Sequence, residues 1–532
     1  MVKEFNAAAM TSYDEVPYTS YPFAQSHPDR LKTVAKLFGL STPPLDFARV
    51  LEIGSSSGGN LIPFATAFPG STCLGIDNSK RQIAEGQNVI EELELPNIQL
   101  RHLDILEVTP ELGTFDYIIA HGVFSWVPTE VQEKILSICQ EMLSPNGVAY
   151  ISYNTYPGWH MRGMIRDMMR YHTERFNGPV IKVRQARALL DFLQQSVRDE
   201  KSAYTVLLRQ EVETIRRHAD FYIYHDYLED VNDPMYFYQF VERAEKHGLQ
   251  FLAEARVGTM YTANFGPDVE KTLRVLATDL VQMEQYMDFL RNRMFRESIL
   301  CHKDRPLQRM IAPNSIYEMY VCSIARTDPK LPVDIVGQTP VTYQSPSGMS
   351  MTTNQPLMKA AMQVLQERWP RYVYFEELRR EARIRLGQGD PEDQTLAMQD
   401  RNLVAVGLLN CYLGSDLVDL RTTAPEFITS VSEKPEVCPL ARVMHRLGGS
   451  VPNRRHEVVN LNDLQKHMLP LLDGKHDRAA IESAMFDLAR REMITLQENG
   501  QTIRDPERQK VAIAALVEAS LMHLAQNALL VA

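Results

Sequence analysis

The chain of 532 residues is longer than a single hydrophobic core usually organises, so we expect two to four domains. Its formal net charge of −11 argues against binding of a nucleic-acid backbone as the main function. The sequence has neither a secretory N-terminus nor a run of about 20 apolar residues that spans a bilayer, so we expect a cytoplasmic protein that is not inserted in a membrane. Six cysteines lie apart without C-x-x-C pairs, and we expect no metal site and no disulfide framework.

The N-terminal part carries an aromatic segment followed by a helix. Residues 12 to 25 contain four aromatic side chains, among them Tyr18 and Tyr21, and two prolines. The helix is expected to start at Ser26-His27-Pro28-Asp29, because Ser26 can cap its first turn and Pro28 needs no N–H there. The aromatic segment is a candidate for a strap that packs against the core, which is one of two roles open to it.

The next element is an apolar run that ends in a turn of small residues. Residues 50 to 53, which include Glu52, lead into Gly54-Ser55-Ser56-Ser57-Gly58-Gly59-Asn60. Glycines at 54 and 58 let backbone N–H groups approach a ligand, and a helix that begins near Asn60 offers its positive end to a carboxylate. The turn differs from the G-x-G-x-x-G turn of NAD-binding proteins because Ser56 stands where the second glycine is required. The segment predicts a site for a nucleotide-like ligand with a carboxylate, although such a turn is often no more than a turn.

Two further predicted strands end in acidic residues. Residues 73 to 76 lead into Asp77 and Asn78, at about the spacing from Glu52 at which an acid accepts hydrogen bonds from ribose hydroxyls. Residues 98 to 103 lead into Asp104, which can accept from an adenine amino group, and Ile105, which can pack on the ring. Gln82 opens the helix after Asp77 and either reaches the ribose or adenine or caps the helix at the surface.

Two more strand-like runs complete the first domain. They cover residues 115 to 121 and 148 to 153, and a segment with helical spacing from 130 to 143 separates them. Strands that alternate with helices in this way predict an α/β fold with a parallel sheet.

The motifs, taken together, resemble a known family. Glu52-x-Gly54-x-x-x-Gly58, Asp77 and Asp104 look like the successive motifs of class I S-adenosylmethionine-dependent methyltransferases, which implies a Rossmann-like domain and S-adenosyl-L-methionine as the cofactor. More narrowly, four segments resemble bacterial methyltransferases with a methyltransferase regulatory domain, a group that includes the rickettsial protein-lysine methyltransferases acting on an outer-membrane protein. These segments are residues 26 to 29, 58 to 63, 121 to 128 and 152 to 159.

The resemblance assigns cofactor-binding residues. In this class the segment before the first strand often folds over the cofactor, so Tyr18 and Tyr21 are either lid residues or part of a packed strap. The complete predicted set is Tyr18, Tyr21, Glu52, Gly54, Ser56, Gly58, Asn60, Asp77, Asn78, Gln82, Asp104 and Ile105.

Aromatic side chains after the fourth and fifth strands are the candidates for the methyl-acceptor side. A lysine must lose its proton before it attacks the sulfonium methyl group, and an aromatic channel favours this by desolvation. Aromatic faces can also hold the cationic methylated product. The predicted catalytic set is Tyr153, Trp159, His121 and Trp126. The alternative is that His121 is structural and that the two tryptophans only pack a helical insertion against the sheet.

The rest of the chain is predicted to be mainly helical. The expected domains are a methyltransferase core over 1–160, a helical insertion with a returning strand at about 249–254 and a regulatory or dimerisation region over 161–330, a winged-helix-like domain over 331–430, and a mainly α domain over 431–532. Residues 266 to 325 are expected to be helical, and residues 408 to 413 and 417 to 420 to form a hairpin. Arg162, Arg166 and Arg170 form either a solvated helix face or a homodimer surface.

The leading hypothesis for the function is methyl transfer to lysine side chains of a protein substrate, with no nucleic-acid partner. Methylation of a small molecule is the competing enzymatic hypothesis, because the first-domain motifs are shared by enzymes with different acceptors. A third hypothesis is a regulatory protein that binds the cofactor without turnover. Accessory regions that exceed half of the chain favour a macromolecular acceptor.

Overall fold

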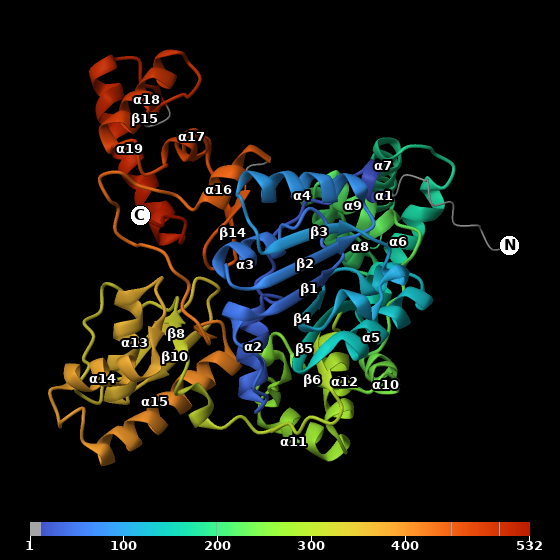
Figure 1. The fold of residues 1–532 in the computed structure, drawn as a ribbon, viewed down its shortest axis with the longest axis horizontal. Coiled ribbons are helices and arrows are strands. Elements are labelled where there is room, and N and C mark those ends of the chain that lie inside the picture. Colours follow the sequence, from blue (N-terminus) through green and yellow to red (C-terminus); the bar gives the residue numbers. More distant parts are fainter. Residues whose placement is uncertain (1–11, 198, 200, 448–449, 499–500) are drawn as a thin grey trace.

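The computed structural model describes residues 12–532 except 198, 200, 448–449 and 499–500 (Figure 1). Its N-terminal half is built on a seven-stranded sheet with the order β3-β2-β1-β4-β5-β7-β6. The strands are β1 (Arg49–Ile53), β2 (Thr72–Asp77), β3 (Ile98–His102), β4 (Phe115–Ala120), β5 (Leu143–Asn154), β6 (Leu249–Glu254) and β7 (Phe295–His302). The first five are parallel, whereas β7 is antiparallel to both β5 and β6. This arrangement confirms the Rossmann-like α/β fold.

Helices cover both faces of the sheet because both faces of its strands are apolar. In β1, Val50 packs into one hydrophobic cluster, and Leu51 and Ile53 pack into the cluster on the opposite face. The helices near the sheet are α2 (Pro28–Leu37), α3 (Leu61–Ala67), α4 (Lys80–Glu92), α5 (Thr129–Met142) and α10 (Phe237–Lys246). The expected helix after the aromatic strap is therefore present, but His27 rather than Ser26 caps it.

Strand β7 corrects the expectation of a helical segment from 266 to 325. Helices α11 (Pro267–Leu276) and α12 (Leu280–Arg291) are present, but β7 follows them and lies between β5 and the predicted sixth strand. Its charged residues obscured the strand pattern in the sequence. Arg296 is fully buried and donates to carboxylates of Glu254 and Asp288, each at 2.8 Å, so its charge is compensated inside the fold.

The predicted helical insertion has a hydrophobic core of its own. It consists of α6 (Trp159–Thr173), α7 (Pro179–Ser196), α8 (Ala203–Arg217) and α9 (Asp220–Leu228). The expectation that its arginines lie on one solvated face is wrong for two of them. Arg166 is buried, and the Arg162 guanidinium lies over the rings of Trp159 and Tyr227.

A middle region begins before residue 320 rather than at 331, since β8 (Tyr320–Ser323) joins its three-stranded sheet in the order β11-β8-β12. The other elements are β9 (Val341–Gln344), β10 (Ser350–Thr353), α13 (Pro356–Arg368), β11 (Val373–Tyr374), α14 (Phe375–Leu386), α15 (Gln394–Gly414) and β12 (Val418–Arg421). Residues 408 to 413, expected in a hairpin, belong to α15. The buried residues Leu408, Leu409, Cys411 and Tyr412 follow helical spacing there.

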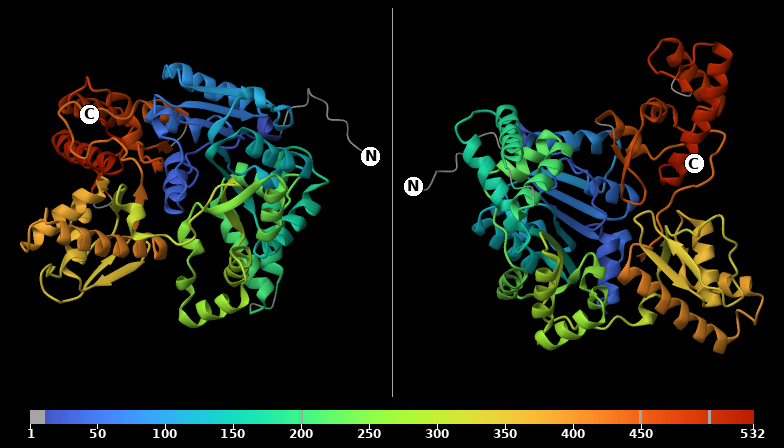
Figure 2. Two further views of the ribbon diagram at one scale, coloured as in Figure 1. Left: turned by 60° about the horizontal axis from the view of Figure 1, so that its bottom comes forward. Right: turned by 180° about the vertical axis from the view of Figure 1, so that it is seen from behind.

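The C-terminal region packs on the sheet domain beside α3 and α4. It contains α16 (Pro439–Met444), β13 (Ser450–Pro452), β14 (Val458–Asn460), α17 (Asp463–Met468), α18 (Arg478–Arg490), β15 (Gln497–Glu498), β16 (Gln501–Thr502) and α19 (Pro506–Gln526). Figure 2 shows the middle and C-terminal regions on one side of the sheet domain and the helical insertion on the opposite side. In the part of the chain that the structure covers, no helix has both the length and the apolar character needed to cross a bilayer.

Candidate active site

The turn between β1 and α3 has a backbone conformation that few residue types adopt. The φ angles of Gly54, Ser56 and Gly58 are 74°, 51° and 77°. A Cβ atom at Gly54 would lie 2.3 Å from Cγ2 of Val123, so glycine is required there by space as well as by φ. The turn therefore lies close against the segment that follows β4, at the carboxyl ends of the central strands.

Asp77 ties this turn to the end of β2. Its Oδ2 accepts from the backbone N–H of Ser56 and its Oδ1 from that of Ser79, both at 2.8 Å. Burial raises the pKa of the Asp77 carboxyl, and these two hydrogen bonds act against that rise. A carboxylate offers about four lone-pair sites, so two acceptor positions remain for the hydroxyls of a ligand.

Three buried polar atoms of the same turn have no hydrogen-bond partner within the protein. They are Oε2 of Glu52 and the hydroxyl oxygens of Ser55 and Ser56. Burial raises the pKa of Glu52 to about 8. Unsatisfied buried polar atoms are costly, so their presence in one turn fits a site that is completed by a polar ligand with donor groups. S-adenosyl-L-methionine has such groups in its ammonium and ribose hydroxyls.

The N-terminal strap lies directly over the turn. The Ser20 hydroxyl accepts from the backbone N–H of Gly59 at 2.8 Å, and the Gln82 amide donates to the carbonyl of Tyr18 at 2.7 Å. A Cβ atom at Gly59 would lie 2.5 Å from the carbonyl carbon of Ser20. Gln82 is 2% exposed and holds the strap, so it is not a surface cap, and its contact with the ribose or adenine stays a prediction. The Tyr18 ring packs edge-on against Phe221 of α9 at 5.2 Å, and Tyr21 is half-buried nearby.

The remaining predicted cofactor residues lie at the same edge of the sheet. Asp104 is half-buried after β3, where its Oδ1 accepts from the backbone N–H of Leu106, and Ile105 follows it. Asn78 is exposed beside Asp77. Asn60 is buried at the start of α3, and its amide is held by protein groups on both sides.

His121 lies at the end of β4 under the strap. Its Nδ1 is 2.9 Å from the Tyr150 hydroxyl, and the ring of Phe23 lies 3.9 Å from the imidazole. Burial, followed by the charge of Arg256, lowers the pKa of His121 to about 4, so the imidazole is neutral at pH 7. Tyr150 and Phe23 were not predicted for the site. The alternation of side chains along β5 could have indicated Tyr150, since it shares a face of the strand with Ser152, which accepts from Gly122.

The structure does not bring Tyr153 to this site. Its side chain is 1% exposed, on the sheet face that α10 covers, where it stacks on Phe240 at 4.1 Å. Its hydroxyl lies 3.2 Å from that of Ser298. The sequence placed Tyr153 after the fifth strand, but β5 continues to Asn154, and at position 153 the pleat directs the side chain into the core.

The two predicted tryptophans contact each other. Trp126 and Trp159 pack edge-to-face with ring centroids 6.1 Å apart. Trp159 is 4% exposed and donates from its indole N–H to Asn232 at 2.7 Å. These contacts attach the first turn of α6 to the sheet domain, as the packing alternative predicted, and Trp126 remains half-buried beside it.

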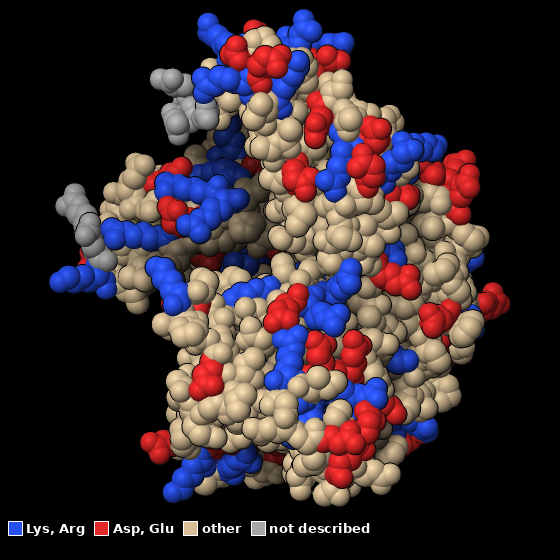
Figure 3. Space-filling view, turned by 90° about the vertical axis from the view of Figure 1, so that its left-hand side faces the viewer, with Lys and Arg blue, Asp and Glu red and all other residues tan. Residues whose placement is uncertain are grey.

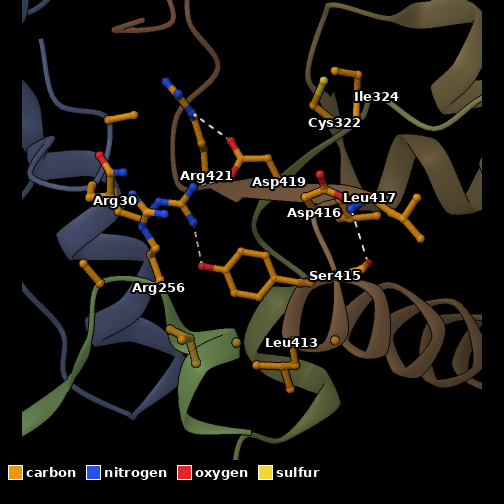
Figure 4. A pocket seen from close by; sticks show the side chains of 18 of the residues that line it. Arg30, Arg256, Cys322, Ile324, Leu413, Ser415, Asp416, Leu417, Asp419 and Arg421 are labelled. Atoms are coloured by element: carbon orange, nitrogen blue, oxygen red, sulfur yellow. Dashed lines mark hydrogen bonds and ion pairs between the residues drawn. The ribbon is translucent and has the colours of Figure 1, made fainter. Parts of the chain in front are cut away.

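A cavity of about 530 Å³ lies between the strap, the segment after β6 and the middle region (Figure 4). Arg30, Arg256, Arg421 and Asp419 are among the residues that line it. Arg30 donates to Asp419 at 2.6 Å and to the Tyr412 hydroxyl at 2.8 Å, which joins α2 to β12 and α15. The cavity lies near the edge that holds His121, because Ala24 of its wall follows Phe23 in the chain, and the Phe23 ring packs on His121.

Three family models match the chain. A methyltransferase domain matches residues 50–147, a predicted methyltransferase regulatory domain matches residues 219–302, and the PKMT C-terminal winged helix domain matches residues 433–529. The last match assigns the winged helix to the C-terminal region, whereas the sequence had suggested 331–430. The middle region resembles a winged helix only in the order of its elements, which is helix, strand, two helices and strand.

Two relatives match almost the whole chain. An uncharacterised protein of Rickettsia prowazekii is 35% identical over 527 residues, which cover 98% of this chain and 93% of the relative. The structure of PKMT2 from Rickettsia typhi is similar with a TM-score of 0.85 and 33% identity, over 97% of this chain and 100% of that one, and it was also solved in complex with AdoHcy. AdoHcy is the product that S-adenosyl-L-methionine leaves after methyl transfer, and the site described above fits that cofactor. The chain therefore belongs to the family of S-adenosylmethionine-dependent methyltransferases that includes PKMT2 of Rickettsia typhi.

Proposed function

We propose that this enzyme transfers methyl groups from S-adenosyl-L-methionine to lysine side chains of a protein substrate. One observation carries the proposal: the likeness to PKMT2 covers the accessory regions as well as the catalytic domain. Small-molecule methyltransferases share the Rossmann-like domain, so a match to that domain alone would not favour a protein acceptor.

The residues of the β1–α3 turn hold and orient the cofactor in this proposal. Asp77 accepts hydrogen bonds from its ribose hydroxyls, and Glu52, with Oε2 unpaired, faces its ammonium group. Asp104 and Ile105 take the adenine. The cofactor, when bound, supplies an electrophilic methyl group on a sulfonium.

The acceptor amine approaches along the edge that holds His121, Phe23 and Tyr150. Free lysine has a pKa near 10.4, so its ammonium must lose a proton before it can attack. Burial among aromatic rings favours the neutral amine, and the uncharged imidazole of His121 contributes no negative charge that would stabilise the ammonium form. These side chains desolvate and orient the amine for in-line displacement.

The cavity beside this edge is the proposed place for the substrate segment around the lysine. Its volume of about 530 Å³ exceeds that of one side chain, and its wall combines arginines with Asp416, Asp419 and Glu457. A wall of mixed charge suits a polar peptide better than a compact apolar metabolite.

We also propose that the chain forms a homodimer through the helical insertion. Tyr171, Val180 and Phe192 are 85%, 74% and 62% exposed there, and such apolar side chains on one set of helices are typical of a protein–protein contact. Light scattering at several concentrations tests this. A mass of twice the monomer for the wild type and of one monomer for Phe192→Glu supports the dimer. A monomeric mass of the wild type at all concentrations contradicts it.

The experiment for the function uses methyl-labelled cofactor with three acceptor pools: intact proteins, lysine-containing peptides, and a protein-free extract. We expect label in proteins, recovered as methyl-lysine after hydrolysis. Label only in the protein-free extract would favour the small-molecule hypothesis. Cofactor binding without transfer to any pool would favour the regulatory hypothesis.

A further inference from the structure

The C-terminal region reaches into the base of the cofactor turn through one histidine. His456 lies in the hairpin turn between β13 and β14, and its Nε2 is 2.8 Å from Oδ1 of Asn60, the residue that directly precedes α3. The two residues are 3% and 5% exposed. Figure 1 shows β14 beside α3, although 396 positions separate the two residues in the sequence.

The protonation of this contact follows from the neighbouring groups. The backbone N–H of Phe23 donates to Oδ1 of Asn60 at 2.8 Å, so this atom of the amide is the oxygen. His456 must therefore donate from Nε2. Burial lowers the pKa of His456 to about 3, which keeps it neutral at physiological pH.

The other end of the Asn60 amide holds the acid of the cofactor turn. Its Nδ2 donates to Oε1 of Glu52 at 2.7 Å and to the Ser26 hydroxyl at 3.1 Å. The second oxygen of Glu52 is the buried atom without a partner that faces the proposed ammonium site. A continuous path of hydrogen bonds thus runs from His456 through Asn60 to Glu52.

The hairpin turn is shaped to present His456. His456 has a φ of 65°, which non-glycine residues seldom adopt, and Oδ1 of Asn453 accepts from the backbone N–H groups of Arg455 and Glu457, each at 2.9 Å. The ring of His27 packs edge-on against that of His456 at 4.6 Å. The backbone at the point of contact is therefore held in one conformation, which directs the His456 side chain toward Asn60.

We propose that His456 is a positioning residue for the cofactor site. By donating to Asn60 it fixes the rotamer of that amide, and through it the Glu52 carboxyl and the first turn of α3. The C-terminal winged-helix region then contributes to cofactor binding without touching the cofactor. The inference concerns cofactor binding alone, and it holds whichever acceptor the enzyme uses.

The test compares three substitutions of the full-length protein. His456→Leu removes the donor and fills the space. His456→Asn introduces an amide and suits the positive φ, but its shorter side chain places no nitrogen at the Nε2 position. His456→Gln places an amide nitrogen close to that position. Arg446→Ala is the matched control, because it removes another contact between the same two regions, the ion pair with Glu92, far from the turn.

Calorimetric titration with AdoHcy gives the dissociation constant, and initial rates give KM for S-adenosyl-L-methionine and kcat. We expect His456→Leu and His456→Asn to raise the dissociation constant and this KM about tenfold while kcat at saturating cofactor changes less than twofold. His456→Gln restores most of the affinity, and Arg446→Ala leaves it unchanged.

Several outcomes would overturn the inference. Wild-type affinity in the Leu or Asn variant would show that the donor is unnecessary. Equal losses in the Gln and Leu variants, or a loss of the same size in Arg446→Ala, would point to general docking of the C-terminal region. If the Leu variant fails to fold, the Asn and Gln pair decides the question. An unmodified protein that binds AdoHcy but methylates no lysine would contradict the proposed function and leave this inference standing.

Discussion

The backbone N–H of Ser56 donates to the carboxylate of Asp77 at 2.8 Å, and this bond fixes the turn after β1 to the end of β2. The two strands are parallel neighbours, so their carboxyl ends lie side by side and one acid can serve both the turn and a ligand. In the proposed assignment, the group that binds the ribose thus also holds the turn in place.

Replacement of Asp77 tests this double role. We expect Asp77→Ala to weaken cofactor binding by about 1–3 kcal/mol, because a charged acceptor for ribose hydroxyls is lost. Asp116→Ala is the control: Asp116 also accepts a backbone N–H, that of Arg49 at 2.9 Å, but at the opposite ends of the strands. Calorimetric titration with AdoHcy measures both. Normal affinity in a folded Asp77→Ala variant would show that Asp77 does not bind the ribose hydroxyls.

The pKa of Glu52 predicts a pH dependence of cofactor binding. With a pKa of about 8, the carboxyl is mainly protonated in the cofactor-free enzyme at pH 7. Binding of the ammonium group favours the ionised form, so affinity should rise from pH 6 to about pH 8 and then level off, with proton release on binding. Titrations in buffers of different ionisation enthalpy measure the released proton. Glu52→Gln should abolish the pH dependence, and a pH-dependent Gln variant would contradict the assignment.

The raised pKa of Glu52 makes the stability of the cofactor-free protein fall with pH, whereas cofactor affinity rises. The pKa of Glu52 is higher in the folded chain than in the unfolded chain, so folding takes up a proton and stability falls as the pH rises from about 4.5 through 8. Glu52→Gln should therefore stabilise the cofactor-free protein at pH 8, on the order of 1–3 kcal/mol, while it weakens cofactor binding. Denaturant unfolding at pH 5 and pH 8 checks this. A Gln variant that is less stable than the wild type at pH 8 would contradict the prediction.

Two tyrosines of β5 make a matched pair for the acceptor side. Tyr150→Phe removes the hydroxyl that contacts His121, and we expect kcat/KM for the acceptor to fall by about 3- to 10-fold. Tyr153→Phe removes the contact with Ser298 on the other face, so it should cost about 1 kcal/mol of stability and leave kcat/KM unchanged. Steady-state kinetics with thermal unfolding separates the two. The reverse pattern would show that the active site lies on the Tyr153 face of the sheet and would contradict the placement beside His121.

Gly59 should be sensitive because the strap lies against it. In Gly59→Ala the new methyl group meets the carbonyl of Ser20 at 2.5 Å, so the strap must move, and we expect KM for the cofactor to rise at least tenfold. Gly163→Ala is the control, since the nearest heavy atom to its Cβ would be 4.0 Å away and alanine favours the α6 helix. Equal KM values in both variants would exclude the strap from cofactor binding.

The C-terminal winged helix should not bind duplex DNA specifically. The chain has a net charge of −11, and on the face shown in Figure 3 Lys and Arg side chains alternate with Asp and Glu around a hollow instead of forming a broad basic surface. A gel-shift selection at physiological salt should recover no enriched sequence. Recovery of one sequence would contradict this prediction.

The elements that the sequence determined are those with local signals. The turn of glycines and serines after β1, the acids after β2 and β3, and the apolar runs of the first five strands are each encoded within a few residues. Parallel strands bring their carboxyl ends to one edge of the sheet, so the neighbourhood of Glu52, Asp77 and Asp104 followed from the order of elements. The helical insertion was also predictable from its spacing.

The tertiary structure alone decided the features that depend on burial and on distant partners. Strand β7 was missed because Arg296 is charged, and the carboxylates of Glu254, Glu284 and Asp288, from other elements, compensate that charge in the fold. Tyr153 was predicted for the site, but the pleat of β5 directs it into the core and leaves Tyr150 beside His121. The contact between His456 and Asn60 joins segments 396 positions apart, and no local pattern encodes it. Periodicity reports which side of an element is buried, whereas a partner from another region is known only once the chain has folded.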